Sequence, residues 1–339
     1  MPMSFLKSFI AFFPVLCYLM WPALSLADGP DRVISIQFEN DFFGGGTDRH
    51  FSHGTHIEYY TGPVHFITKW ADKLPWYDPR NEMDAPEDAL EGRASISMGQ
   101  NIYTPENTFT ENPVPNQRPY AGWLYMGFGL MANQGSNRYD KIKLEIGIIG
   151  PASLAEDVQT FWHSLFGLHV PEGWDNQLEN ELGVVLYYEQ AYRIHPPGKL
   201  FTLEYDLVPH IGGSLGNVFT YGSAGYTIRL GRGLEKDFGP PRIQPSLPGG
   251  GYFSKSALNW YLFAGMQGRV VLRNIFLDGN TFTESLSVKK KHLVGDFQAG
   301  ITFQWERVSI SYTQIIRTKQ FGGQDSNDVF GSLSISYLF

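Results

Sequence analysis

The most constraining feature of this chain is the alternation of apolar and polar side chains in segments spread along its whole length. Apolar and polar residues alternate strictly from Ile34 to Glu39, again in residues 141–146, and again in residues 332–337. Successive side chains of a β-strand project to opposite faces, so each segment predicts a strand with one apolar and one polar face. Such strands suit a membrane β-barrel, in which one face meets lipid and the other lines a polar interior.

The aromatic content supports a barrel. Aromatic residues make up 15% of the chain, with 18 Tyr and 8 Trp, yet no segment after residue 27 is long and apolar enough for a membrane-spanning helix. Membrane barrels carry aromatic girdles at both interfaces, which reconciles these observations. The last strand ends on Phe339, which is typical of the signal read by the outer-membrane assembly machinery. We therefore expect an all-β, antiparallel transmembrane β-barrel, with a soluble β-sandwich as the alternative.

The same pattern predicts twelve strands, an even number that places both chain ends in the periplasm. Odd-numbered connections then lie outside the cell. The stretches 78–91 and 239–251 become periplasmic turns of unusual length. The strands are expected near residues 32–40, 51–61, 92–101, 119–132, 138–149, 181–193, 200–212, 216–231, 257–270, 292–304, 307–317 and 329–339.

The N-terminus fits a cleaved secretory signal over residues 1–27, which leaves one barrel domain over residues 28–339. Lys7 supplies the charged start, and small residues around Ala27 offer a cleavage site. Pro14 interrupts the apolar run and disfavours the alternative, a retained membrane helix. Cys17 is the single cysteine, so the mature chain should contain no disulfide and no cysteine-bound metal.

The charge balance is acidic. The formal net charge is -8 and becomes -9 when Lys7 leaves with the signal. An acidic chain argues against nucleic-acid partners. We expect a monomer in the outer membrane of a Gram-negative cell.

A short helix is expected outside the barrel wall, on the extracellular side, after Gly150-Pro151. Ser153 and Glu156 have the spacing of a capping box, and Leu154, Val158 and Trp162, with Leu165 or Phe166, form an apolar stripe. The predicted topology brings this helix to the same side of the membrane as the end of the first strand and the loop from Tyr103 to Arg118. Gln159 and His163 lie four residues apart and share a helix face. The alternative for His163 is an interfacial histidine beside Trp162 without a chemical role.

The end of the first strand offers oxygen ligands. Asn40 and Asp41 precede a glycine-rich turn, and a carboxylate beside a carboxamide suits calcium. The alternative is a pair that caps the turn. Ser52 lies opposite Asp41 across the hairpin and offers a hydroxyl. The histidines at positions 50, 53 and 56 are three residues apart, so they alternate between faces and should not form a metal cluster.

Two further motifs carry less weight. Gly212-Gly213-Ser214-Leu215-Gly216 matches the nucleophile elbow by its letters, but that elbow joins a parallel strand to a helix. We expect a tight extracellular turn there. The lysines at positions 289, 290 and 291 either meet lipopolysaccharide phosphates or form a solvated charged run.

Together these segments resemble the outer-membrane lipid A 3'-O-deacylase family. The resemblance spans roughly residues 33–339 and is carried, in order, by Phe38–Phe43, Thr47–Gly54, Tyr103–Pro105, Gln117–Trp123, Gly150–Ser153, Val158–Gln159 with His163, and Gly173–Leu178. It implies a twelve-stranded barrel that uses calcium to remove an ester-linked acyl chain from the 3' position of lipid A.

The resemblance also implies residue roles. His163 corresponds to the family's catalytic base, Gln159 to its helix partner, and Asn40 with Asp41 to its metal and oxyanion end. Ser52 stands where members carry Thr or Ser. The chain departs from the family at Gln117, which replaces an acidic residue, and in the loop after Pro105, which lacks basic residues. Substrate binding is therefore assigned to Arg118, Tyr103 and Lys290.

The expected reaction is direct hydrolysis. Neutral His163 takes a proton from water, which attacks an ester carbonyl polarised by calcium, while Asn40 or Ser52 donates a hydrogen bond to the oxyanion. One rival is an outer-membrane phospholipase with a serine nucleophile at Ser52 or Ser164. The other is a porin or receptor without activity, which ranks last because Glu39, Lys143 and Glu145 can pair inside the lumen and block it.

Overall fold

The computed structural model describes residues 31–41, 43, 50–64, 67, 90–134, 137–194, 197–251, 253 and 255–339. The predicted signal peptide, with Cys17, lies outside the described residues, as does nearly all of the stretch 78–91. In the part of the chain that is described, no helix has both the length and the apolar character needed to cross a membrane.

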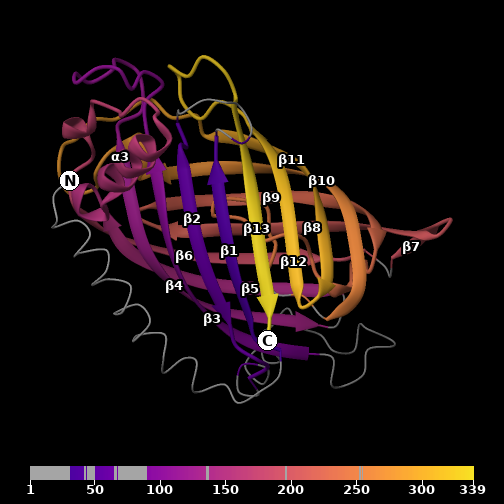
Figure 1. Ribbon diagram of the computed structural model, residues 1–339. Helices are drawn as coiled ribbons and strands as arrows, with labels where there is room; N and C mark the ends of the chain where they lie inside the picture. Colours follow the sequence, from indigo (N-terminus) through magenta and orange to yellow (C-terminus); the bar gives the residue numbers. More distant parts are fainter. Residues whose placement is uncertain are drawn as a thin grey trace.

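The described strands form a closed antiparallel β-barrel (Figure 1). Consecutive long strands pair with one another, β1 also pairs with β13, and β6 pairs with β8, which completes the ring. The prediction of twelve barrel strands is confirmed. They are β1 Val33–Asn40, β2 His53–Tyr60, β3 Leu90–Tyr103, β4 Ala121–Gln134, β5 Arg138–Ile149, β6 Glu181–Tyr192, β8 Leu203–Gly216, β9 Phe219–Arg232, β10 Ser256–Asn274, β11 Leu293–Glu306, β12 Val308–Arg317 and β13 Asp328–Leu338.

Burial follows the alternation predicted from the sequence. In β1, Gln37 and Glu39 are each 1% exposed, whereas Phe38 between them is 37% exposed. The polar side chains therefore line the interior, and the apolar ones cover the outer wall. Closure leaves the barrel strands without a free edge, which a lipid environment requires because lipid cannot hydrogen-bond an exposed backbone.

The two ends of the barrel differ. Val33 pairs with Leu338, so the start of β1 and the end of β13 lie at one end, here called the terminal rim. The opposite end, the helix rim, carries helix α3 (Ala155–Phe166) and the connections that follow β1, β3, β5, β8, β10 and β12 (Figure 1). The first described strand thus runs from the terminal rim to Asn40 at the helix rim.

Two sequence expectations are corrected here. The segment Gly212–Gly216 is not a turn, because it forms the end of β8, and the turn to β9 is Asn217 and Val218. A Cβ atom on Gly216 would lie 2.1 Å from the backbone oxygen of Val184, so the glycine allows β8 to approach β6. The remaining strand, β7 (Gly198–Leu200), is a short addition that pairs only with β8 and extends beyond the barrel (Figure 1).

The predicted periplasmic turn 239–251 is also wrong, because this connection folds into the lumen. We call residues 233–251 the plug segment. Arg242 Nε lies 2.5 Å from Glu39 Oε1, close to the helix rim, and the same arginine donates to Gln298 over 2.9 Å. Closer to the terminal rim, the backbone N–H of Gly251 donates to the Tyr60 hydroxyl over 3.3 Å. The plug segment therefore spans most of the barrel interior.

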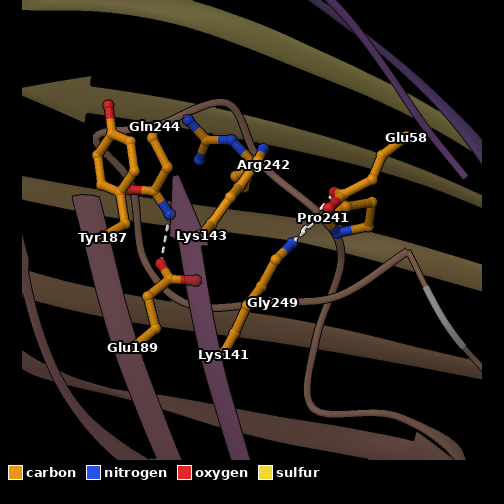
Figure 2. A pocket seen from close by; sticks show the side chains of 9 residues that line it. All are labelled: Glu58, Lys141, Lys143, Tyr187, Glu189, Pro241, Arg242, Gln244 and Gly249. Atoms are coloured by element: carbon orange, nitrogen blue, oxygen red, sulfur yellow. Dashed lines mark hydrogen bonds and ion pairs between the residues drawn. The ribbon is translucent and has the colours of Figure 1, made fainter. Parts of the chain in front are cut away.

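Charged side chains hold the plug segment against the wall. The amide of Gln244 in the plug segment donates to the Glu189 carboxylate of β6, and beside it Lys141 of β5 lies 2.9 Å from Glu58 Oε1 of β2 within the wall (Figure 2). Between plug and wall these residues line a cavity of about 20 Å³, room for one water molecule. Lys143 pairs with Glu145 at 2.9 Å, so the expected pairing in the lumen is present, but the partner of Glu39 is Arg242 of the plug segment.

Candidate functional site

The predicted helix is present outside the wall, but its predicted capping box is not. Residue Leu154, with φ 60° and ψ 21°, is the N-cap of α3, and no side chain caps the helix. Ser153 belongs to the preceding 3₁₀ turn η2 (Pro151–Ser153), and its backbone oxygen accepts a hydrogen bond from Gln100 Nε2 over 2.6 Å. Because a Cβ atom on Gly122 would lie 2.1 Å from the Ser153 hydroxyl oxygen, that hydroxyl is directed at the wall and not at the helix.

Helix α3 packs on the outer face of β3 and β4 with its less hydrophobic side. Ala155 and Gln159 are buried, and Val158 packs against the cluster of Ile102, Tyr120, Ala155 and Trp174. The other residues of the predicted stripe point away from the barrel, with Leu165 59% and Phe166 67% exposed. In a water-soluble protein the apolar face of such a helix would face the protein core. Here it faces outward, which suits a helix whose outer face meets hydrocarbon.

Two residues of α3 carry the polar part of the site. Gln159 Oε1 accepts a hydrogen bond from the Trp174 indole N–H over 3.0 Å, and both side chains are buried. His163 donates from Nδ1 to the backbone oxygen of His169. A carbonyl can only accept, so this bond selects the tautomer in which Nε2 of neutral His163 carries the lone pair.

Asn40, Asp41 and Ser52 form the second part of the site. The Asn40 amide donates from Nδ2 to the backbone oxygen of Ser52 over 2.7 Å. The Ser52 hydroxyl is 2.6 Å from the Thr104 hydroxyl, and Ser52 is 1% exposed. Asp41 is 4% exposed and follows the last residue of β1, where strict alternation of faces ends.

The register brings Asn40 to the same outer face of the wall as α3. Asn40 pairs with His53, which pairs with Ile102, and all three have outward parity at the helix rim. Adjacent strands are about 4.8 Å apart, so Asn40 and Ile102 are separated by about 10 Å. Because α3 covers Ile102, Asn40 lies within two strands of the helix that bears His163.

The oxygen donors fit a hard cation such as calcium. Asn40 and Asp41 are consecutive residues that supply an amide oxygen and a carboxylate, and the amide nitrogen of Asn40 is held by the bond to Ser52. Within the described ranges, no group of three or more His, Cys, Asp or Glu side chains is arranged to hold a metal. The candidate oxygen donors at this end of β1 are the Asp41 carboxylate and the Asn40 amide oxygen.

The residues predicted to bind substrate come from two different regions of the helix rim. Arg118 stacks over the Tyr103 ring at 4.5 Å, and both are buried under the helix rim. Lys290 Nζ is 2.6 Å from Asp278 Oδ1 and belongs to the β10–β11 connection. In the strand order β4-β3-β2-β1-β13-β12-β11, that connection lies on the side of the barrel opposite α3.

Arg118 is a buried cation that has no hydrogen-bonded anion among the described residues. Its three guanidinium nitrogens are buried and have no hydrogen-bond partner among the described residues. Burial disfavours the charged form and lowers the pKa of Arg118 to about 10, so the side chain remains charged at neutral pH. Such a group is costly to bury and is typical of a functional position.

We expect Arg118→Met to stabilise the barrel. Removing an uncompensated buried charge should raise the free energy of unfolding by about 1–2 kcal/mol, because the lost cation–π contact offsets part of the gain. The measurement is urea unfolding of the refolded barrel in lipid vesicles. The matched control is Arg269→Met, which removes a cation paired with Asp296 at 2.9 Å and should destabilise the protein. Equal destabilisation by both variants would contradict the prediction.

Sequence reasoning missed several residues of this region. His169 supplies the carbonyl that orients His163, Trp174 holds Gln159, and Thr104 holds Ser52. His50 Nδ1 lies 2.5 Å from Asp328 Oδ1, which joins the β1–β2 connection to the start of β13. The tryptophan in the polar segment after Gly173 could have been found from the sequence, because a large aromatic residue among polar ones indicates a specific packing contact. The other contacts depend on loop paths that no local pattern encodes.

Comparisons with known proteins concern the family and the fold of this chain. The family model described as outer membrane protein LpxR matches residues 11–339. The solved structure of LpxR from Salmonella typhimurium is 21% identical, with a TM-score of 0.71, and covers 91% of this chain and 100% of its own. The β-domain of the Bordetella autotransporter BrkA is 10% identical, with a TM-score of 0.42, over 92% of this chain and 99% of its own. No curated protein matches.

The match to the family model extends over nearly the whole chain, and it confirms the resemblance drawn from the sequence segments. The solved LpxR structure independently shows the same barrel. This chain therefore belongs to the LpxR family of outer-membrane proteins.

Proposed function

We propose that this protein hydrolyses the ester-linked 3'-acyl group of lipid A, with His163 as the general base. The family assignment supports a lipid A-modifying protein of the outer membrane. The observation that carries the finer proposal is the hydrogen bond from His163 Nδ1 to the His169 carbonyl, on a helix outside the wall. That bond presents a basic nitrogen within two strands of the oxygen donors at Asn40 and Asp41.

The chemistry of His163 follows from this bond. Nε2 takes a proton from a water molecule as the water attacks the ester carbonyl. The resulting imidazolium keeps its Nδ1–H bond to the His169 carbonyl, which stabilises the new charge and holds the ring in place. Positioned general bases contribute about 10²- to 10⁴-fold to a reaction rate. The proton then passes from Nε2 to the departing alcohol oxygen.

Asn40, Asp41 and Ser52 are proposed to hold the metal ion and to orient its ligands. The Asn40 amide nitrogen is engaged by the Ser52 carbonyl, and the Ser52 hydroxyl by Thr104. These bonds favour a supporting role for Ser52 over that of nucleophile, and they fix the direction of the Asn40 amide oxygen. Asn40 and Asp41 would hold a calcium ion, which when bound supplies a Lewis acid for the ester carbonyl.

Substrate access is proposed to be lateral, from the outer leaflet. The plug segment fills the lumen, so the barrel interior is not a route for a lipid. The exposed apolar face of α3 continues the apolar outer wall at the helix rim. A lipid can therefore reach the space beside α3 with its acyl chains still in hydrocarbon. In this proposal the helix rim faces the cell exterior.

Mass spectrometry of lipid A tests the proposed function. We expect lipid A from a tester strain that expresses this protein to lose one ester-linked acyl group, and we expect a chelator to block the loss and added Ca²⁺ to restore it. Unchanged lipid A, in membranes where the folded barrel is present, would contradict the proposal. Labelling of Ser52 or Ser164 by a fluorophosphonate, with release of phospholipid acyl chains, would favour a serine phospholipase.

A further inference from the structure

The chain turns back sharply after α3 and passes His163 again. Gly167, with φ 67°, ends the helix in the left-handed region that glycine adopts readily. The backbone N–H groups of Gly167 and Leu168 both donate to the His163 carbonyl, the latter over 2.8 Å. This reversal brings the His169 backbone oxygen to His163 Nδ1.

A second loop holds the returning segment. The His169 ring stacks on Phe109, with ring centroids 3.7 Å apart and planes 13° apart. His169 Nε2 lies 3.2 Å from the Thr108 backbone oxygen, which also accepts from the Glu172 N–H over 3.0 Å. Thr108 is 6% exposed, so its backbone oxygen accepts these bonds in a buried part of the loop. The contacts join the β3–β4 connection to the segment after α3.

Phe109 is oriented by its own loop. Its backbone N–H donates to the Asn107 side-chain oxygen over 3.0 Å, which closes a tight local turn. The ring is 69% exposed, although His169 covers one of its faces. A large exposed aromatic ring stacked on a histidine has no evident part in the barrel core. Its contact reaches His163 through one residue, His169.

We propose that Phe109 and His169 form a clamp that positions His163 for catalysis. This inference rests on the proposed function and adds two positioning residues to it. The stack and the Thr108 contact hold the His169 backbone, whose carbonyl selects the His163 tautomer and fixes the direction of Nε2. Small displacements of a catalytic group cost large factors in rate, so loosening the clamp lowers turnover without removing the base.

Single substitutions test the clamp in the purified full-length protein, with lipid A in detergent micelles and Ca²⁺. Phe109→Ala and His169→Ala keep the His169 carbonyl but lose the stack. We expect each to lower kcat about tenfold with KM nearly unchanged. His169→Phe keeps the stack but loses the Nε2 contact to Thr108, so it should retain more activity than His169→Ala, and Phe109→Tyr should retain most of the activity. Phe282→Ala is the matched control, because Phe282 is also an exposed aromatic, 82% exposed, in a different connection.

The double variant separates a clamp from two independent effects. If Phe109 and His169 act through one contact, Phe109→Ala in the His169→Ala background should cost little more, because the contact is already lost. Additive losses, wild-type turnover in both single variants, or an effect on KM alone would overturn the clamp. Heat-modifiable migration on gels verifies folding of each variant.

The clamp and the proposed function fail in different ways. His163→Ala is measured first, and if it retains activity, the assignment of His163 as base fails. If His163→Ala is inactive and the two clamp variants turn over like the wild type, the base assignment stands and the clamp alone is wrong.

Discussion

His163→Ala should lose ester hydrolysis by about 10²- to 10⁴-fold while the barrel still folds. His163 lies on α3, outside the wall, and its Nδ1 bonds to the backbone of the segment that follows the helix. Folding should therefore be unaffected. The measurement is acyl release from lipid A, with folding followed by circular dichroism and by heat-modifiable migration.

Two controls sharpen this prediction. His163→Gln keeps a polar side chain of similar reach but cannot accept a proton at neutral pH, so it should be as inactive as His163→Ala. His292→Ala changes an exposed histidine in the β10–β11 connection and should keep full activity. Activity of His163→Ala within a few-fold of wild type would exclude this residue as the base.

Asp296→Ala should give the largest loss of stability. Asp296 is 1% exposed and pairs with Arg269 and Arg317, each at 2.9 Å. Removing it leaves two buried guanidinium groups without their counterion, which costs about 3–5 kcal/mol. Urea unfolding in lipid vesicles measures the loss. Asp325→Ala, an exposed carboxylate in the β12–β13 connection, is the matched control and should be nearly neutral.

The same variant should loosen the plug segment. Arg269 and Arg317 both donate to the Pro245 backbone oxygen, over 3.0 and 2.8 Å. Without Asp296 these arginines are no longer held in place, so the plug segment loses its hydrogen bonds at Pro245. In planar bilayers we expect the wild type to be nearly silent and Asp296→Ala to conduct ions. A wild-type protein with steady porin-like conductance, or a variant as stable as wild type, would contradict this account.

The plug segment also explains why a Pro- and Gly-rich stretch is so long. It is not a surface turn, because Arg242 and Gln244 form bonds to the wall inside the lumen. Its proline and glycine content allows an irregular path, and its backbone polar groups find partners in the polar lining of the barrel. An irregular segment at membrane depth is tolerated where protein surrounds it.

The strands were predictable because alternation is a local property. Whether Ile34 or Gln37 faces lipid depends on its neighbours in the chain, so the pattern gave twelve strands with boundaries close to those observed. An even strand count then placed Asn40, the loop before Arg118 and the helix with His163 at one end. That convergence required no knowledge of tertiary contacts.

The supporting contacts were decided only by the tertiary structure. Arg242 reaches Glu39 across 203 positions of sequence, and His50 reaches Asp328 across 278. Such pairs depend on where long connections turn, and no period in the sequence records that path. The same holds for Lys290, whose expected substrate role was drawn from its charge before its ion pair with Asp278 was visible. The sequence by itself determined the barrel and the end at which the candidate site lies, because side-chain alternation is read residue by residue. The plug segment, the clamp on His163 and the partner of each buried charge arose only when closure of the sheet brought distant residues into contact.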